Sequence, residues 1–223
     1  MHFPSLLIFL LVLLETQAQD LKSGGVLKPD QAIVDIRHYT IALDVSPSAQ
    51  TIDGYAEIDF ITSAPTTVLL FDLVSLLTVD KVWVNKKEQP FSHQNDLIRI
   101  SLSSALPVGK STVKIQYGGK PGIAPRPPWV GGFTWAKDST GNPWVAITCC
   151  GEGAKIYFPC KDHPSDEPNE GADLIITVPK GLYVAGPGLL QKTTTKGNKS
   201  TFHWKTNYTI NNPTFGQLTS TDA

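Results

Sequence analysis

The side chains with most potential for chemistry are five histidines and three cysteines, and their spacing limits what they could do. A zinc hydrolase commonly holds its metal with two histidines one helical turn apart, in a His-Glu-x-x-His sequence. That sequence is absent, and no histidine has a second within ten residues; the five are His2, His38, His93, His163 and His203. Gly-x-Ser-x-Gly and Gly-x-x-x-x-Gly-Lys are also absent. The sequence therefore predicts no complete active site.

A cysteine nucleophile is the remaining catalytic alternative. Cys160 lies three residues before His163, and Cys150 is the other candidate thiol. Nucleophilic catalysis also needs a third group that orients the base, and none stands at a persuasive spacing. A cysteine hydrolase is therefore the least favoured interpretation. With three cysteines at most one disulfide can form, from Cys149 or Cys150 to Cys160, and buried free thiols are the other possibility.

The segment around Cys160 carries the most local information. Gly151 and Gly153 permit a sharp turn, and the residue before Pro159 is expected to be extended. An acidic turn follows, with Asp162, His163, Asp166 and Glu167 between prolines. These carboxylates could bind a cation, but a turn neutralised by Lys155 or Lys161 is the favoured interpretation.

Alternation of apolar and polar residues indicates the elements that must position these side chains. No stretch of helical length carries an apolar stripe with a period of 3.6 residues, whereas a period of two recurs along the chain. The predicted strands are residues 37–45, 51–61, 66–73, 79–84, 97–102, 112–117, 144–148, 172–178, 183–185 and 201–205. Turn signals separate them, so we expect an all-β domain, a sandwich or a large twisted sheet.

Residues 118–143 interrupt this alternation. The segment is rich in proline and glycine, which predicts a long loop, yet it also contains Trp129, Phe133 and Trp135. Aromatic residues in a loop are expected to pack against something. They form either a lid over the domain's own core, which is favoured, or a docking surface for a ligand or another domain.

The first residues have the features of a secretory signal peptide. Nine apolar residues from Leu6 to Leu14 precede a small-residue cleavage site at Ala18. As a helix this run would rise about 14 Å, short of the roughly 30 Å hydrocarbon core, so no stable membrane span is expected. We therefore predict a signal peptide at 1–18, a lead-in at 19–30, a β-domain at 31–212 and a tail at 213–223. The expected location is secreted or periplasmic.

Composition narrows the classes of function. The chain has 223 residues, 41% of them hydrophobic and 17% charged, which is typical of a globular protein. Its formal net charge of −1 offers no basic patch for nucleic acid or an anionic membrane. This length suits one large β-domain and leaves little room for a multidomain enzyme.

Residues 153–164 resemble a motif of the zinc aminopeptidase N family, the metallopeptidases that include leukotriene hydrolase. The matching residues are Lys155, Phe158, Pro159, Cys160, Asp162 and Pro164. Upstream, residues 35–44 and 52–58 resemble the opening hairpin of that family's N-terminal domain. Downstream, residues 172–186 resemble its strand, Val-Pro and strand passage. The resemblance extends over about residues 30–210.

This resemblance implies a saddle-like domain of twisted, mainly antiparallel sheets that packs on a thermolysin-like catalytic domain. In the family, the zinc-binding His-Glu-x-x-His and the Gly-x-Met-Glu-Asn exopeptidase loop belong to that catalytic domain, and this sequence contains neither. The expectation is a non-catalytic domain, inert alone, of a secreted enzyme that removes N-terminal amino acids from peptides. Zinc and peptide substrate are expected only in the parent enzyme. The alternative is a secreted β-sandwich binding module for a peptide, glycan or protein.

One substrate-binding position of the family lies in the N-terminal domain. It is a Gln or Glu, a little before the Pro-Cys motif, that helps to hold the substrate's free α-amine. An ungapped count from the motif places it at Cys150, which supplies neither a carboxylate nor an amide. Glu152 lies two residues further and would share the same face of an extended segment. Glu152 is therefore a candidate for the amine-binding residue, although a solvated turn carboxylate is the favoured interpretation.

Overall fold

Three β-sheets build the domain in the computed structural model, which describes residues 22–209, 211 and 218–220. One short helix, α1 (Pro29–Ala32), precedes the first strand. The largest sheet has the order β13-β14-β11-β1-β2-β8-β4-β5. Its strands are β1 (Val34–Ser46), β2 (Thr51–Thr62), β4 (Leu77–Val84), β5 (Lys87–Glu88), β8 (Gly109–Gly119), β11 (Ala172–Pro179), β13 (Leu189–Lys196) and β14 (Lys199–Thr206).

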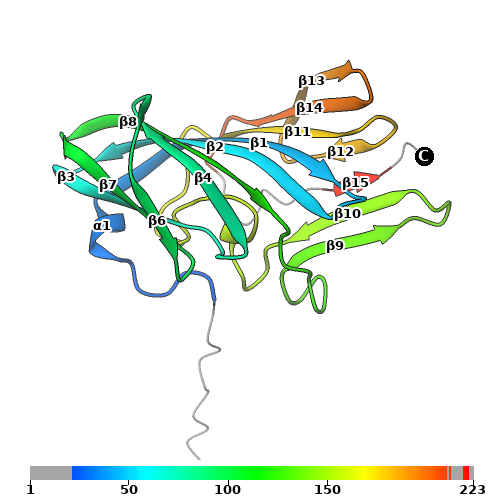
Figure 1. The fold of residues 1–223 in the computed structure, drawn as a ribbon, viewed down its shortest axis with the longest axis horizontal. Helices are drawn as coiled ribbons and strands as arrows, with labels where there is room; N and C mark the ends of the chain where they lie inside the picture. The colour runs from blue at the N-terminus through cyan, green and yellow to red at the C-terminus, as the bar shows by residue number, and fades with distance from the viewer. Residues whose placement is uncertain (1–21, 210, 212–217, 221–223) are drawn as a thin grey trace, which may run out of the picture.

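Two smaller sheets lie toward opposite ends of this large sheet (Figure 1). One has the order β3-β7-β6 and consists of β3 (Thr66–Asp72), β6 (Phe91–Gln94) and β7 (Leu97–Leu106). The other has the order β12-β15-β10-β9, with β9 (Gly132–Lys137), β10 (Pro143–Thr148), β12 (Tyr183–Ala185) and β15 (Leu218–Ser220). Together these sheets confirm the predicted all-β class.

The alternating residues of the central strands form the hydrophobic core. Tyr39, Ile41 and Leu43 of β1 are at most 2% exposed, and the same face is buried on β2 and β8. The core continues into the smaller sheets through residues such as Phe71 and Phe133. Burial of this one face explains why the period of two predicted these strands.

The structure adds a strand pairing that the sequence did not specify, and it corrects the expectation for residues 118–143. β1 and β11 pair in parallel, with Ile41 opposite Leu174, although every other strand pair is antiparallel in the part of the chain that the structure describes. The prediction that residues 118–143 form a loop throughout is wrong, because β9 pairs with β10 from Gly132 to Lys137. Turn residues on either side obscured the short apolar alternation at Phe133 and Trp135.

No helix within the described residues is long and apolar enough to cross a membrane. The predicted signal peptide at 1–18 and most of the predicted tail at 213–223 lie outside the described residues.

Candidate functional site

A pocket beside Glu152 is the strongest candidate site. It has a volume of about 290 Å³ and lies where the turn after β10 meets residues 122–132 and the segment before β4. Its walls are mainly apolar and glycine-rich; they are formed by Val74, Leu76, Gly122, Ile123, Pro125, Val130, Gly131, Gly132 and Ile156. Glu152 and Lys22 supply the charged groups. An acidic group in an apolar pocket is a suitable receptor for a cationic ligand group.

The backbone of a tight turn positions Glu152. The amides of Glu152 and Gly153 both donate to the carbonyl of Cys149, at 3.2 and 2.9 Å. Gly131 lies directly against this turn, because a Cβ atom there would approach the Glu152 Cγ to 2.8 Å and the Thr148 carbonyl to 2.6 Å. The position of the Glu152 side chain therefore requires a glycine at position 131.

The carboxylate of Glu152 already has a cationic partner. The Lys22 ammonium lies 3.1 Å from Glu152 Oε1, and the Lys22 side chain is 71% exposed whereas that of Glu152 is only 17% exposed. Next to it, Ser23 Oγ donates to Asp162 Oδ1 at 2.8 Å and the Gly24 amide donates to the Asp162 carbonyl at 3.2 Å. The N-terminal segment is thus held against the turn, with an ammonium group on the Glu152 carboxylate.

Cys150, the position given by the ungapped count, is exposed on this turn but is not part of the pocket wall. The structure therefore places Glu152, and not Cys150, in the wall of this pocket. Sequence reasoning missed Lys22, because nothing in its spacing indicates contact with a residue 130 positions away.

The Phe158 to Asp162 motif fastens the pocket turn to the core. Cys160 and Asp72 exchange two backbone hydrogen bonds, of 2.7 and 3.0 Å. The Lys155 ammonium lies 3.4 Å from Asp162 Oδ2, and a Cβ at Gly153 would meet Asp162 Oδ1 at 2.2 Å. Burial raises the pKa of Asp162, while hydrogen bonds from Ser23 and Lys155 oppose that rise. These contacts have a structural role.

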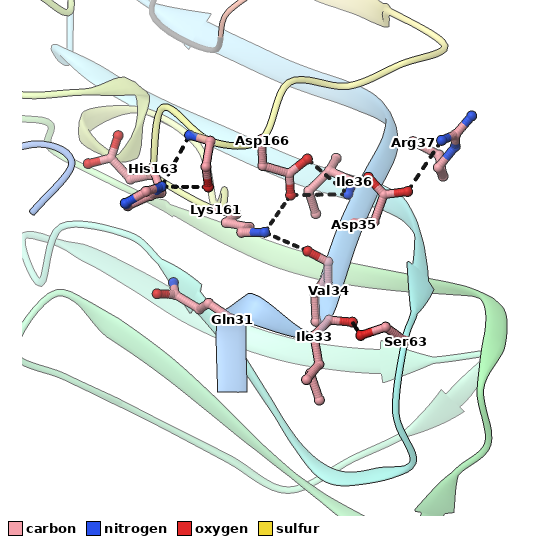
Figure 2. Close-up of polar contacts among 12 residues, drawn as sticks. Gln31, Ile33, Val34, Asp35, Ile36, Arg37, Ser63, Lys161, His163 and Asp166 are labelled. Carbon is pink, nitrogen blue, oxygen red and sulfur yellow. Dashed lines mark hydrogen bonds and ion pairs between the residues drawn. The ribbon is translucent and has the colours of Figure 1, made fainter. Parts of the chain in front are cut away.

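The acidic turn is neutralised within the protein. The Lys161 ammonium lies 2.7 Å from Asp166 Oδ2 and donates to the Val34 carbonyl at 2.6 Å (Figure 2). Asp166 in turn accepts from the Ile36 amide at 3.2 Å. The expected counter-ions, Lys155 and Lys161, are therefore confirmed. Among the described residues, no three His, Cys, Asp or Glu side chains gather so that they could hold a metal ion, so zinc does not fit this part of the chain.

The cysteines are free and mostly inaccessible. Cys149 and Cys160 are buried, Cys150 is exposed, and none is in a disulfide. Burial raises the pKa of Cys149 to about 12 and that of Cys160 well above its ordinary value. A thiol that remains protonated is a weak nucleophile. The ring of His163 contacts Ser165 Oγ through Nδ1 at 2.7 Å. This geometry gives no support to a hydrolase built on Cys160 and His163.

The three aromatic residues proposed as one docking surface have different environments. Phe133 is fully buried, so its assignment to a docking surface is wrong; β9 directs its ring into the core. Trp135 stacks on Phe133 with a centroid separation of 5.3 Å and packs partly against the core. Trp129 is 71% exposed. Of the three, only Trp129 presents most of its side chain to solvent.

Comparison of the structure with solved structures identifies the fold. The structure of this chain matches that of an M1 zinc metallopeptidase from Deinococcus radiodurans. The TM-score is 0.71 and the identity 19%, over 84% of this chain and 42% of the other. The structure also matches a mutant of that enzyme bound to a Tyr-Ser-Ala substrate, with a TM-score of 0.72, 20% identity and coverage of 85% and 43%. Native yeast LTA4 hydrolase matches with a TM-score of 0.67 and 18% identity, over 92% of this chain and 31% of that one.

These likenesses define the class of domain. The chain has the fold of the N-terminal β-domain of M1 zinc aminopeptidases and LTA4 hydrolase. It spans less than half the length of each of these enzymes. At such low identity the likeness shows the fold. No family model matches the sequence, and a search of curated proteins found no match.

Proposed function

We propose that this chain is the non-catalytic N-terminal β-domain of a secreted zinc aminopeptidase that removes N-terminal amino acids from peptides. In this proposal a thermolysin-like catalytic domain supplies the zinc site and the peptide-bond chemistry. The chain alone is inert, because the 223 residues contain neither His-Glu-x-x-His nor Gly-x-Met-Glu-Asn. The observation that carries the proposal is the match of 84% of the chain to 42% of a two-domain M1 zinc metallopeptidase.

Within that enzyme, Glu152 binds the free α-amine of the peptide. Three features support this role: the carboxylate lies in a pocket, its side chain is 17% exposed, and it holds an ammonium group at 3.1 Å in the Lys22 pair. A peptide α-amine carries the same charge and the same donors as the Lys22 ammonium. Peptide binding would therefore displace Lys22 toward solvent.

Steady-state kinetics of the parent enzyme test this role. We expect Glu152→Gln to raise KM for aminoacyl substrates by about tenfold or more, because the ion pair with the α-amine is lost. The matched control is Glu170→Gln, which removes an exposed carboxylate paired with Arg37 instead. An unchanged KM in the Glu152 variant would exclude the amine-binding role. Sequencing the transcript beyond codon 223 tests the domain assignment separately, with in-frame zinc and exopeptidase motifs as the expected result.

A binding module is the second candidate function. It is favoured by three large apolar side chains on the surface, Leu76, Ile123 and Trp129, which are 65–71% exposed. In the leading proposal the catalytic domain contacts this surface, whereas a binding module would use it for a peptide, a glycan or another protein. Under the first proposal Trp129→Ser should weaken association with the catalytic domain, whereas under the second it should weaken binding of the peptide, glycan or other protein.

A further inference from the structure

A second candidate site lies on the polar outer face of the large sheet. More of its lining residues are polar or charged than in the pocket at Glu152. Two adjoining pockets, of about 380 and 510 Å³, lie over β2, β8 and β4, which are neighbours in the sheet (Figure 1). Both pockets are lined by Trp83 and Lys114, so they form one continuous trough. Each volume is within the roughly 300–1,000 Å³ typical of small-molecule sites.

Strand register builds the floor of this trough. Lys114 of β8 pairs with Glu57 of β2 on one side and with Trp83 of β4 on the other, so the three residues form a row across the sheet. Tyr55 lies two residues along β2 from Glu57 and therefore on the same face. The Lys114 ammonium lies 3.6 Å from the centroid of the Tyr55 ring, which fixes both side chains beside the indole of Trp83.

The side chains of the trough have the properties of a carbohydrate receptor. Trp83 provides a flat apolar surface that suits the C–H face of a sugar ring, and Tyr55 adds a second ring that holds the Lys114 ammonium beside it. Polar groups border these rings, and they include the donors and acceptors that sugar hydroxyls need: Asp53, Glu57, Asn85, Thr112, Lys114 and Gln116. The trough differs from the apolar pocket at Glu152 because it contains two aromatic rings together with hydrogen-bond donors and acceptors.

The charge of the trough selects among ligand classes. Its two carboxylates, Asp53 and Glu57, are balanced by two ammonium groups, Lys86 and Lys114. A site without net charge offers no overall attraction to a nucleic acid or an acidic lipid surface. Peptides that bind sheets commonly pair with the main chain of an edge strand, but β2 and β8 have hydrogen-bonded neighbours on both sides. The aromatic ring of Trp83 and the balanced polar groups of the trough suit a neutral, hydroxyl-rich ligand.

We propose that the trough around Trp83, Tyr55 and Lys114 binds a neutral oligosaccharide. One sugar ring stacks on the Trp83 indole, and neighbouring hydroxyls donate to Glu57 and accept from Lys114 and Asn85. This site is independent of the peptidase assignment, because it lies on β2, β4 and β8 and shares no lining residue with the Glu152 pocket.

An oligosaccharide array probed with the full chain, followed by calorimetric titration of the best neutral ligand, tests the proposal. We expect binding to neutral oligosaccharides and a loss of affinity of about tenfold or more in Trp83→Ala, since the stacking surface is removed. Tyr208→Ala is the matched control, because it removes an exposed aromatic side chain, 62% exposed, outside the trough and should leave affinity unchanged.

A second measurement guards against misfolding of the Trp83 variant. In amide NMR spectra of the unmodified chain, the neutral ligand should shift signals from β2, β4 and β8, and Lys114→Met should weaken binding while circular dichroism stays unchanged. The proposal is overturned if no neutral oligosaccharide binds, if only acidic ones bind, or if Trp83→Ala and Tyr208→Ala bind equally well. Self-association of the chain that Trp83→Ala abolishes would also overturn it, since the trough would then be an interface between copies.

Discussion

Lys161 and Asp166 form a buried ion pair with 2.7 Å between the ammonium and a carboxylate oxygen, and both side chains are only 6% exposed. Each partner also binds the backbone of β1, Lys161 at the Val34 carbonyl and Asp166 at the Ile36 amide. The pair therefore ties the loop after the Pro-Cys motif to the first strand of the sheet (Figure 2). Through that loop it also fixes Asp162, which holds the N-terminal segment near the pocket.

Removal of one member of this pair should be strongly destabilising. Lys161→Met leaves the Asp166 carboxylate buried without its cation, so we expect the free energy of unfolding to fall by about 3–5 kcal/mol. Urea denaturation at neutral pH measures this change. The double variant Lys161→Met with Asp166→Leu should lose less than the sum of the two single variants. A single variant that loses less than about 1 kcal/mol would contradict a structural role for the pair.

Thiol labelling should distinguish the three cysteines. Because burial raises the pKa of Cys149 to about 12 and keeps Cys160 protonated, iodoacetamide at pH 8 should modify only the exposed Cys150. In denaturant all three should react. Peptide mass mapping identifies the modified residues, and rapid labelling of Cys160 in the native protein would contradict the burial described here.

The carboxylate of Asp173 should make the free energy of unfolding depend on pH in acidic solution. Burial raises its pKa, but the His203 hydrogen bond of 2.5 Å and the charges of Lys205 and His38 outweigh burial, so the pKa falls below its ordinary value of 3.8. The stabilisation it provides is complete above the unfolded-state pKa and is lost as pH falls through the lowered folded-state pKa. Asp173→Asn should therefore destabilise the protein at pH 7, and the difference from the unmodified protein should shrink below pH 3.8.

Urea denaturation across this pH range measures the difference. Asp80→Asn, at an exposed carboxylate on β4, provides the control and should change stability little at any pH. A difference for Asp173→Asn that stays constant from pH 7 to strongly acidic solution would contradict the linkage.

Phe133 and Trp129 should respond oppositely to the same substitution. Phe133→Ser removes a fully buried ring and should cost about 3–5 kcal/mol, whereas Trp129→Ser should change stability by about 0.5 kcal/mol or less. Thermal unfolding followed by circular dichroism compares them. Equal destabilisation by both changes would show that Trp129 is also a core residue.

The alternation of apolar and polar residues was sufficient to predict the central strands of the large sheet but not its edge strand β13. In β1, β2 and β8 one face is buried against the core, so apolar residues recur every second position. β13 was missed because all eight of its residues are exposed and its sequence carries no alternation. The parallel pairing of β1 with β11 was also not predictable, since local patterns carry no information on which distant strand becomes a neighbour.

The candidate sites were predictable to different degrees. Glu152 was identified from its distance to the Pro-Cys motif, and the structure places it in a pocket. Lys22 was not identified, because the contact joins residues far apart in the chain. The trough at Trp83 was missed for a similar reason: its residues come from three separate strands, and only the strand register brings them into one row.

Aminopeptidase activity of the purified chain is the most direct test of the central claim, that this is a non-catalytic domain. The assay follows release of amino acids from aminoacyl-anilide substrates with and without added Zn²⁺, with an active zinc aminopeptidase as the positive control. We expect no release above that of heat-denatured protein in either condition. Turnover that depends on Zn²⁺ and is saturable in substrate would contradict the central claim.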